Sequence, residues 1–201
     1  MNLYGRRRMM RKTSRIPSEY RQVEYLESTG TQAIVTNIYP DMENDVVIAY
    51  ADLDIYNHTK TMAIFGSSDG SSVFNSCGYT TMGHKFFMQV GGGSSFVRLD
   101  PTSGKHLFIS NYKDNEFIVD ENSIPSSFAK KSSPTPYVLF AQRLQEPFSV
   151  FLYGKIYSIE FVGKAKFIPC VRKSDSKPGM YDTVSKTFYT NAGTGEFIIP
   201  A

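Results

Sequence analysis

Short runs of alternating hydrophobic and polar residues recur along most of this chain. They are rich in Val, Ile, Phe and Tyr, most are four to eight residues long, and clusters of Gly, Ser, Asn and Asp separate them. This pattern is typical of β-strands joined by turns. The predicted strands span residues 32–38, 46–53, 61–65, 85–90, 95–99, 106–111, 116–120, 137–141, 150–161, 167–171, 187–190 and 196–199.

Helical periodicity is weak throughout the sequence. No stretch of ten or more residues has a convincing helical pattern, and residues 19–27 are the best short candidate. Many strands without intervening helices indicate antiparallel sheets, and two packed sheets are the usual way to bury them. Residues 91–93 are predicted to join two strands as a hairpin, and residues 125–136 to form a long exposed loop. The sequence therefore predicts an all-β fold, an antiparallel two-sheet sandwich.

Motifs near the two ends of the chain carry a resemblance to a known group of proteins. They are YRQVEYLESTGTQ (20–32), GKIYS (154–158), FIPC (167–170), GMYD (179–182) and FYTNAGTGEF (188–197). Together they resemble the concanavalin A-like, or laminin-G-like, jelly-roll modules of phage structural proteins and gut-bacterial surface proteins. The sequence departs from the usual opening at Ala33 and Val35, where an aromatic and an acidic residue are expected.

The resemblance implies a concanavalin A-like jelly roll over residues 20–201, in which the two termini pair in adjacent strands. One jelly roll hosts unrelated activities, so the resemblance says little about a site. The motif residues themselves are read as parts of the fold. The glycines are expected at turns that need a positive φ, and the aromatics in the core. They are Gly30, Gly154, Gly179, Gly193 and Gly195, and Tyr157, Phe161, Phe167, Phe188, Tyr189 and Phe197.

The charge of the chain is divided unevenly. Residues 1–21 hold seven basic groups and one acidic group, whereas residues 22–201 hold 15 basic and 18 acidic groups. We therefore predict two parts, an extended basic amino-terminal arm over residues 1–19 and one sandwich over residues 20–201. No run approaches the roughly 18 apolar residues of a membrane span, which predicts a soluble protein without a membrane partner. The arm has no apolar stretch after its arginines and so does not read as a secretory signal.

The basic arm has three readings. Its basic residues could dock on an acidic capsid, portal or tail surface, form a solvated tail, or contact nucleic acid phosphates. Because Tyr4 is the only ring before Tyr20, base stacking is not supported and nucleic acid is the least favoured partner. Docking on the particle is the favoured reading. The residues that would dock are Arg6, Arg7, Arg8, Arg11, Lys12 and Arg15.

Motifs for chemistry are weak. Glucanases of this fold use two carboxylates on one strand face, but after Glu43 and Asp45 the third position is Val47, so these acids are read as the solvated start of a strand. Asp52 and Asp54 share a strand face, yet calcium needs six or more oxygens. Cys77 and Cys170 lack a metal-ligand spacing and are read as two buried free thiols. We expect no catalytic residues, no metal and no cofactor.

Carbohydrate binding is the natural function to test for this fold. Sugar sites combine an aromatic ring with Asn, Asp and backbone donors. The candidates lie in loops of the middle of the chain, where selectable surface is expected. They are Tyr56, Asn57 and His58 in one loop, Asn75, Tyr79 and His84 in another, and Asn111 and Tyr112 at a strand end.

The favoured hypothesis is a non-catalytic bacteriophage virion protein: a head fibre, capsid decoration or tail-associated protein. It would be made in the host cytoplasm and displayed on the virion surface as a homo-oligomer, with a trimer as our guess. Its partners would be capsid or tail proteins and a host-surface glycan. The alternatives are a purely structural decoration protein without a ligand, a glycoside hydrolase-like domain without a recognisable catalytic pair, and a bacterial surface adhesin.

Overall fold

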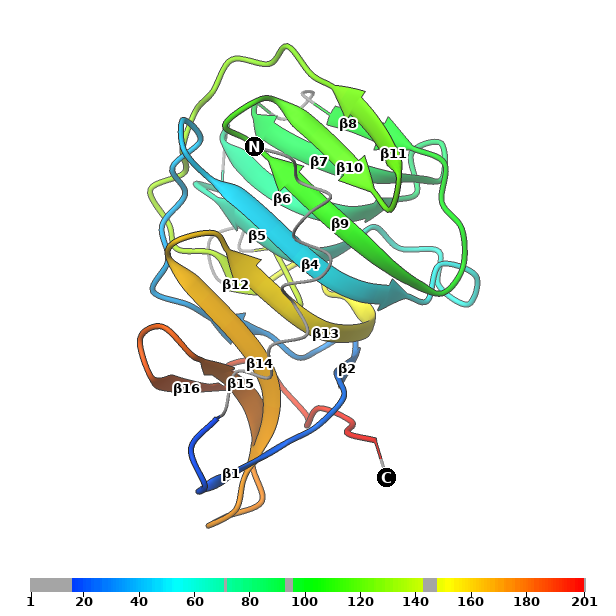
Figure 1. Ribbon diagram of the computed structural model, residues 1–201. Helices are drawn as coiled ribbons and strands as arrows, with labels where there is room; N and C mark the ends of the chain where they lie inside the picture. The colour runs from blue at the N-terminus through cyan, green and yellow to red at the C-terminus, as the bar shows by residue number, and fades with distance from the viewer. Residues whose placement is uncertain (1–15, 71, 93–95, 143–147, 201) are drawn as a thin grey trace.

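The computed structural model describes residues 16–70, 72–92, 96–142 and 148–200 (Figure 1). All regular secondary structure in these ranges is β-strand, and none is helix. The strands are β1 (Tyr20–Gln22), β2 (Leu26–Thr29), β3 (Ile34–Val35), β4 (Val46–Leu53), β5 (Met62–Ser68), β6 (Phe74–Thr80), β7 (Lys85–Gly91), β8 (Phe96–Leu99), β9 (Lys105–Asn111), β10 (Glu116–Val119), β11 (Asn122–Pro125), β12 (Val138–Leu139), β13 (Tyr153–Phe161), β14 (Ala165–Arg172), β15 (Pro178–Asp182) and β16 (Thr187–Thr190).

The strands form two sheets, and within each sheet every pair of neighbouring strands is antiparallel. Sheet A has ten strands, with the order β11-β10-β9-β4-β13-β14-β15-β16; β2 pairs with β13 and β1 with β14. Sheet B has six strands, in the order β3-β12-β5-β6-β7-β8. Figure 1 shows the two sheets as layers, with β4, β9 and β13 across the nearer one. The predicted all-β, antiparallel, two-sheet sandwich is confirmed.

One large hydrophobic core lies between the sheets. Alternate residues of β4, from Val47 to Leu53, point into it, as expected of a strand with one buried face. Aromatic rings from both sheets interlock there: the ring of Phe161 lies 5.9 Å from Phe65 and 4.9 Å from Tyr137. Such edge and tilted contacts add to the free energy gained by burying the rings.

The opening and closing motifs of the chain contact each other. The Gln32 side chain, which is 1% exposed, accepts a hydrogen bond from the Thr29 amide (2.8 Å) and donates one to the Glu196 carbonyl (3.1 Å). Glu27 and Ile198 form an antiparallel bridge. The two ends of the domain therefore contact each other, but through one bridge and not through a pair of adjacent strands. The strand predicted at residues 196–199 is reduced to this bridge.

The motif glycines are needed for two different reasons. Gly30, Gly154 and Gly195 have positive φ values of 92°, 141° and 69°, as predicted. Gly179 and Gly193 do not have a positive φ, so that prediction was wrong for them. A Cβ atom there would overlap the backbone carbonyl of Tyr189 or Thr31, because another chain segment passes against the glycine.

The aromatic residues of the motifs also differ in where their side chains lie. Phe161, Phe167 and Phe197 lie in the main core, and Tyr189 is partly buried against it. Tyr157 and Phe188 were also expected in the core, but they are half-buried outside it. Their rings instead contact cations, since Lys105 Nζ lies 3.6 Å from the Tyr157 ring centroid and the Arg172 guanidinium 5.2 Å from that of Phe188.

Several boundaries differ from the sequence prediction. β6 was missed because its small and polar residues resemble a turn, although six of its seven residues are buried. Residues 19–27, the best helix candidate, contain β1 and the start of β2 instead. The loop predicted over residues 125–136 has no strand except at Pro125, which ends β11, and it is not fully exposed. Ser133 is 3% exposed because its amide donates a hydrogen bond to Asn75 Oδ1 at 2.8 Å.

Both cysteines are buried and unpaired, Cys77 in β6 and Cys170 in β14. The prediction of two buried free thiols is confirmed. Loss of hydration on burial raises the pKa of each thiol to about 12. Because the thiolate is the reactive form, both residues act as small hydrophobic side chains.

Candidate functional site

A depression lies at one end of sheet A, where β4 ends and β9 and β13 begin. We call it the rim depression; its volume is about 220 Å³. Strands β2, β4 and β13 and the turn before β9 supply its walls, which places a mixture of charged, aromatic and glycine residues at one edge of the sandwich. It is lined by Glu27, Asp52, Leu53, Asp54, Tyr56, Ser103, Gly104, Gly154 and Lys155.

The turn after β4 presents an aromatic ring at this depression. Tyr56 is 74% exposed, the highest exposure among the exposed large hydrophobic side chains of the described residues. The Asp54 carboxylate holds the turn, since its Oδ1 accepts hydrogen bonds from the Asn57 amide nitrogen (3.3 Å) and from Asn57 Nδ2 (2.8 Å). His58 Nε2 lies 3.6 Å from Asp54 Oδ2. The structure therefore brings together the first predicted group, Tyr56, Asn57 and His58, and adds Asp54 to it.

A second tyrosine supports the same turn from β13. The rings of His58 and Tyr153 are stacked, with centroids 3.8 Å apart and planes inclined by 26°. Lys60 Nζ lies 3.5 Å from Tyr153 Oη. On another side the Tyr153 ring packs against Gly30, where a Cβ atom would overlap it. No local sequence pattern marks Tyr153 as a site residue, because almost a hundred residues separate it from the Tyr56 turn.

Charges of alternating sign cross the outer face of sheet A beside the depression. Four charged residues are register partners in a row across neighbouring strands. They are Glu27 in β2, Lys155 in β13, Asp52 in β4 and Lys105 in β9. Lys155 Nζ is 3.9 Å from Glu27 Oε2 and 4.9 Å from the Tyr25 ring centroid. Partial burial, followed by the negative charges of Asp52 and Glu24, raises the pKa of the neighbouring Tyr157. Cross-strand pairs of opposite charge stabilise a sheet modestly.

The second predicted loop group is mostly inside the protein. Asn75 is fully buried in β6; its amide donates to the Lys131 carbonyl (3.0 Å), and its Oδ1 accepts from the Ser133 amide. Tyr79 is 3% exposed, and its hydroxyl lies 2.8 Å from Nδ1 of the exposed His84. Asn75 holds the 126–136 segment and Tyr79 packs in the core, so neither presents a glycan-binding surface.

The third predicted group is buried as well. Asn111 is 2% exposed and binds Asp114 through both its side-chain amide and its side-chain oxygen, which shapes the turn between β9 and β10. Tyr112 is 0% exposed and belongs to the main core. The expectation that these residues form accessible loop surface was wrong, because polar residues beside turns can be buried when their hydrogen bonds are satisfied internally.

The two acidic residues before β4, Glu43 and Asp45, differ in burial. Asp45 was expected at a solvated strand start, but it is 3% exposed and paired with Lys164 Nζ at 2.6 Å. Its Oδ2 also accepts a hydrogen bond from the Asp41 amide at 2.8 Å. The Glu43 side chain is 72% exposed, with Oε2 3.5 Å from Lys130 Nζ. Asp45 thus has a structural role in fixing the start of β4.

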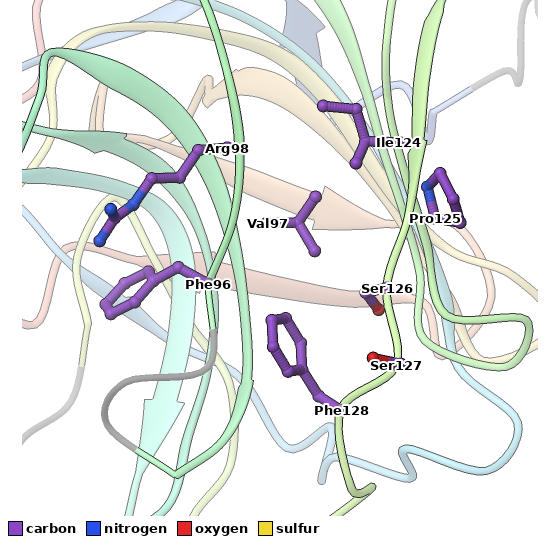
Figure 2. A pocket seen from close by; sticks show the side chains of 8 residues that line it. All are labelled: Phe96, Val97, Arg98, Ile124, Pro125, Ser126, Ser127 and Phe128. Carbon is purple, nitrogen blue, oxygen red and sulfur yellow. The ribbon is translucent and has the colours of Figure 1, made fainter.

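A second cavity, the edge groove, opens between β8 and β11, the end strands of sheets B and A (Figure 2). Its volume is about 450 Å³. Phe96, Val97, Ile124 and Phe128 give it an apolar lining, and the Arg98 guanidinium lies 5.0 Å from the Phe96 ring centroid. Ser126 and Ser127 complete one wall. None of the predicted site residues lines this groove.

The remaining observations concern metal-ligating side chains, membrane-spanning helices and the basic arm. Within residues 16–70, 72–92, 96–142 and 148–200, no three His, Cys, Asp or Glu side chains are grouped so that they could hold a metal ion. The same ranges contain no helix that is long and apolar enough to cross a membrane. The six residues of the proposed docking arm, Arg6, Arg7, Arg8, Arg11, Lys12 and Arg15, lie outside the described residues.

No protein family model, no curated protein and no solved structure matches this chain.

Proposed function

We propose that this protein is a non-catalytic binding module of a bacteriophage virion, and that its rim depression binds a host-surface glycan. The observation that carries the binding role is the exposed Tyr56 ring beside a depression lined with carboxylates. An aromatic ring can pack on the apolar face of a sugar, while carboxylate and amide groups accept and donate hydrogen bonds to its hydroxyls. The turn around Asp54 and the His58–Tyr153 stack hold that ring beside the depression.

The proposed fold is a concanavalin A-like jelly roll. Its support is the resemblance of the terminal motifs, together with the contacts that those motifs make with each other through Gln32 and Asn191. Asn191 Oδ1 accepts a hydrogen bond from the Ala33 amide at 2.9 Å. The same resemblance, to modules common in phage structural proteins, supports the virion setting. The second candidate is a structural decoration protein without a ligand. A protein that joins particles at normal occupancy but binds no glycan would favour this candidate.

The proposed attachment to the particle uses the basic arm. We expect that replacing all six basic residues of residues 1–15 by glutamine lowers the occupancy of purified particles at least about tenfold, because each lost surface charge pair contributes a few tenths of a kcal/mol or more. Occupancy is measured by quantitative mass spectrometry of particles that incorporate the full-length variant or the wild type. Unchanged occupancy would rule out the arm as the anchor.

The proposed glycan site depends on Tyr56. We expect Tyr56→Ala to weaken the affinity for a glycan selected on an array by about three- to tenfold, because the loss of an aromatic stacking contact costs about 0.5–1.5 kcal/mol. Titration calorimetry measures the affinity. Folding should be unaffected, since the ring is 74% exposed.

The matched control is Tyr39→Ala. Tyr39 is also exposed, at 57%, but it does not line the depression. Its replacement should leave the affinity unchanged. Equal losses in the two variants, or none in either, would contradict a site at Tyr56.

A further inference from the structure

The charges at the rim depression are unequal. The depression is lined by three carboxylates, those of Glu27, Asp52 and Asp54. It is lined by one ammonium group, that of Lys155. Lys155 Nζ faces Glu27 Oε2 at 3.9 Å and the Tyr25 ring at 4.9 Å. The Asp54 carboxylate is occupied by Asn57 and lies beside His58. The lining therefore carries an excess of negative charge.

Asp52 is the carboxylate that this arrangement leaves available. It lies in register between Lys155 and Lys105. Both ammonium groups nevertheless lie over tyrosine rings, that of Lys105 at 3.6 Å from the Tyr157 centroid. Among the described residues, neither lysine comes within ion-pair distance of the Asp52 carboxylate, which is half-buried at the wall of the depression. A partly desolvated carboxylate of this kind interacts more strongly with a ligand charge than a fully hydrated one does.

We propose that the rim depression selects its glycan by charge and that Asp52 is the specificity-determining residue. The depression takes sugars that carry a protonated amino group in preference to neutral sugars. It rejects sugars that carry carboxylate or phosphate groups. An ammonium group on the ligand supplies the positive partner that Asp52 lacks, whereas an anionic sugar meets like charges at close range. This inference rests on the proposed glycan-binding function and adds the ligand class to it.

The test compares three oligosaccharides of equal length: oligomers of glucosamine, N-acetylglucosamine and galacturonic acid. Affinities of the full-length protein are measured by calorimetry at a mildly acidic pH, where the amino groups are protonated, and at low and high salt. We expect glucosamine oligomers to bind about two- to fivefold more tightly than N-acetylglucosamine oligomers, and galacturonate oligomers to bind most weakly. High salt should reduce these differences.

Variants separate this site from other charges on the protein. Asp52→Asn should bring the glucosamine to N-acetylglucosamine affinity ratio close to one. Glu43→Gln removes the same charge at the opposite end of β4, from a side chain that is 72% exposed, and should leave the ratio unchanged. Tyr56→Ala is measured in parallel. The binding that this variant loses comes from the depression, and the binding that it retains comes from other charges such as those of the basic arm.

The outcomes distinguish this inference from the function on which it rests. Binding that depends on Tyr56 but does not follow ligand charge, or a ratio that Asp52→Asn leaves intact, overturns the charge selection alone. If none of the three oligomers, nor any glycan on a broad array, binds in a Tyr56-dependent way, both the glycan site and its selectivity are refuted.

Discussion

Replacement of Gly78 by alanine is expected to lower the free energy of unfolding by about 3 kcal/mol, because it overpacks the middle of sheet B. Gly78 lies in β6 opposite Ala63, where the pairing with β5 shifts register. A Cβ atom there would overlap the carbonyl oxygen of Met62 and lie 2.8 Å from the Ala63 Cα. Both are backbone atoms, which cannot rotate away as a side chain can. The two strands would have to separate, and the buried residues around Cys77 would move with them.

Urea denaturation followed by intrinsic tyrosine fluorescence measures this loss. The matched control is Gly83→Ala, since Gly83 has a positive φ of 78° but open space where a Cβ atom would lie. Its cost should be limited to the backbone conformation, about 1 kcal/mol. A Gly78→Ala variant no less stable than Gly83→Ala would show that β5 and β6 accommodate the methyl group, and that the close approach is not required.

Asp182→Ala is expected to be at least as damaging, with a loss of about 4 kcal/mol. Asp182 is fully buried at the end of β15. Its Oδ1 accepts hydrogen bonds from the amides of Lys166 (2.9 Å) and Val184 (3.0 Å). Its Oδ2 accepts from Ser185, through the amide (3.1 Å) and the hydroxyl (2.6 Å). Alanine would leave four partly buried donor groups without their charged acceptor, and each such loss is costly.

Two comparisons test the reason for that loss. Asp182→Asn keeps the shape and one acceptor oxygen, so its stability should lie between those of the wild type and the alanine variant. Asp175→Ala removes an acid that binds the Arg172 side chain at the surface, a hydrogen-bonded contact that lowers the pKa of Asp175 to about 2. Exposed pairs contribute little to stability. If Asp182→Ala and Asp175→Ala unfolded at the same urea concentration, the buried Asp182 carboxylate would not have the role assigned to it.

Asp182 and its motif also explain why the carboxy-terminal sequence is recognisable. Asp182 ends the GMYD motif and binds both the following turn and β14, and Gly179 in the same motif allows the backbone of β16 to approach. The motifs therefore record contacts that build the sandwich. None of the residues in the carboxy-terminal motifs lines the edge groove, and only Gly154 and Lys155 line the rim depression.

The predicted exposure of the loop at Tyr56 is confirmed, because local sequence controls local structure there. Tyr56 and Asn57 follow a strand that ends at Leu53, and Asp54 closes the turn over three residues, so this group could be recognised from neighbouring positions. Asn75 and Tyr79 show where such reasoning fails. Their neighbours are small and polar, which suggests a loop, but hydrogen bonds to distant backbone satisfy Asn75 and make a buried strand favourable.

Local information in the sequence was thus enough for the β-rich class, for most strands and for the exposed turn at Tyr56, because alternation and turn residues act over a few positions. The rim depression, in contrast, depends on contacts between distant parts of the chain. Tyr153 reaches His58 and Gly30, and Lys155 stands between Glu27 and Asp52, through strand pairings that no local pattern specifies. Register across a sheet depends on packing of the whole core. For that reason the charge and shape of the rim depression could not be predicted from the sequence and are seen in the folded chain.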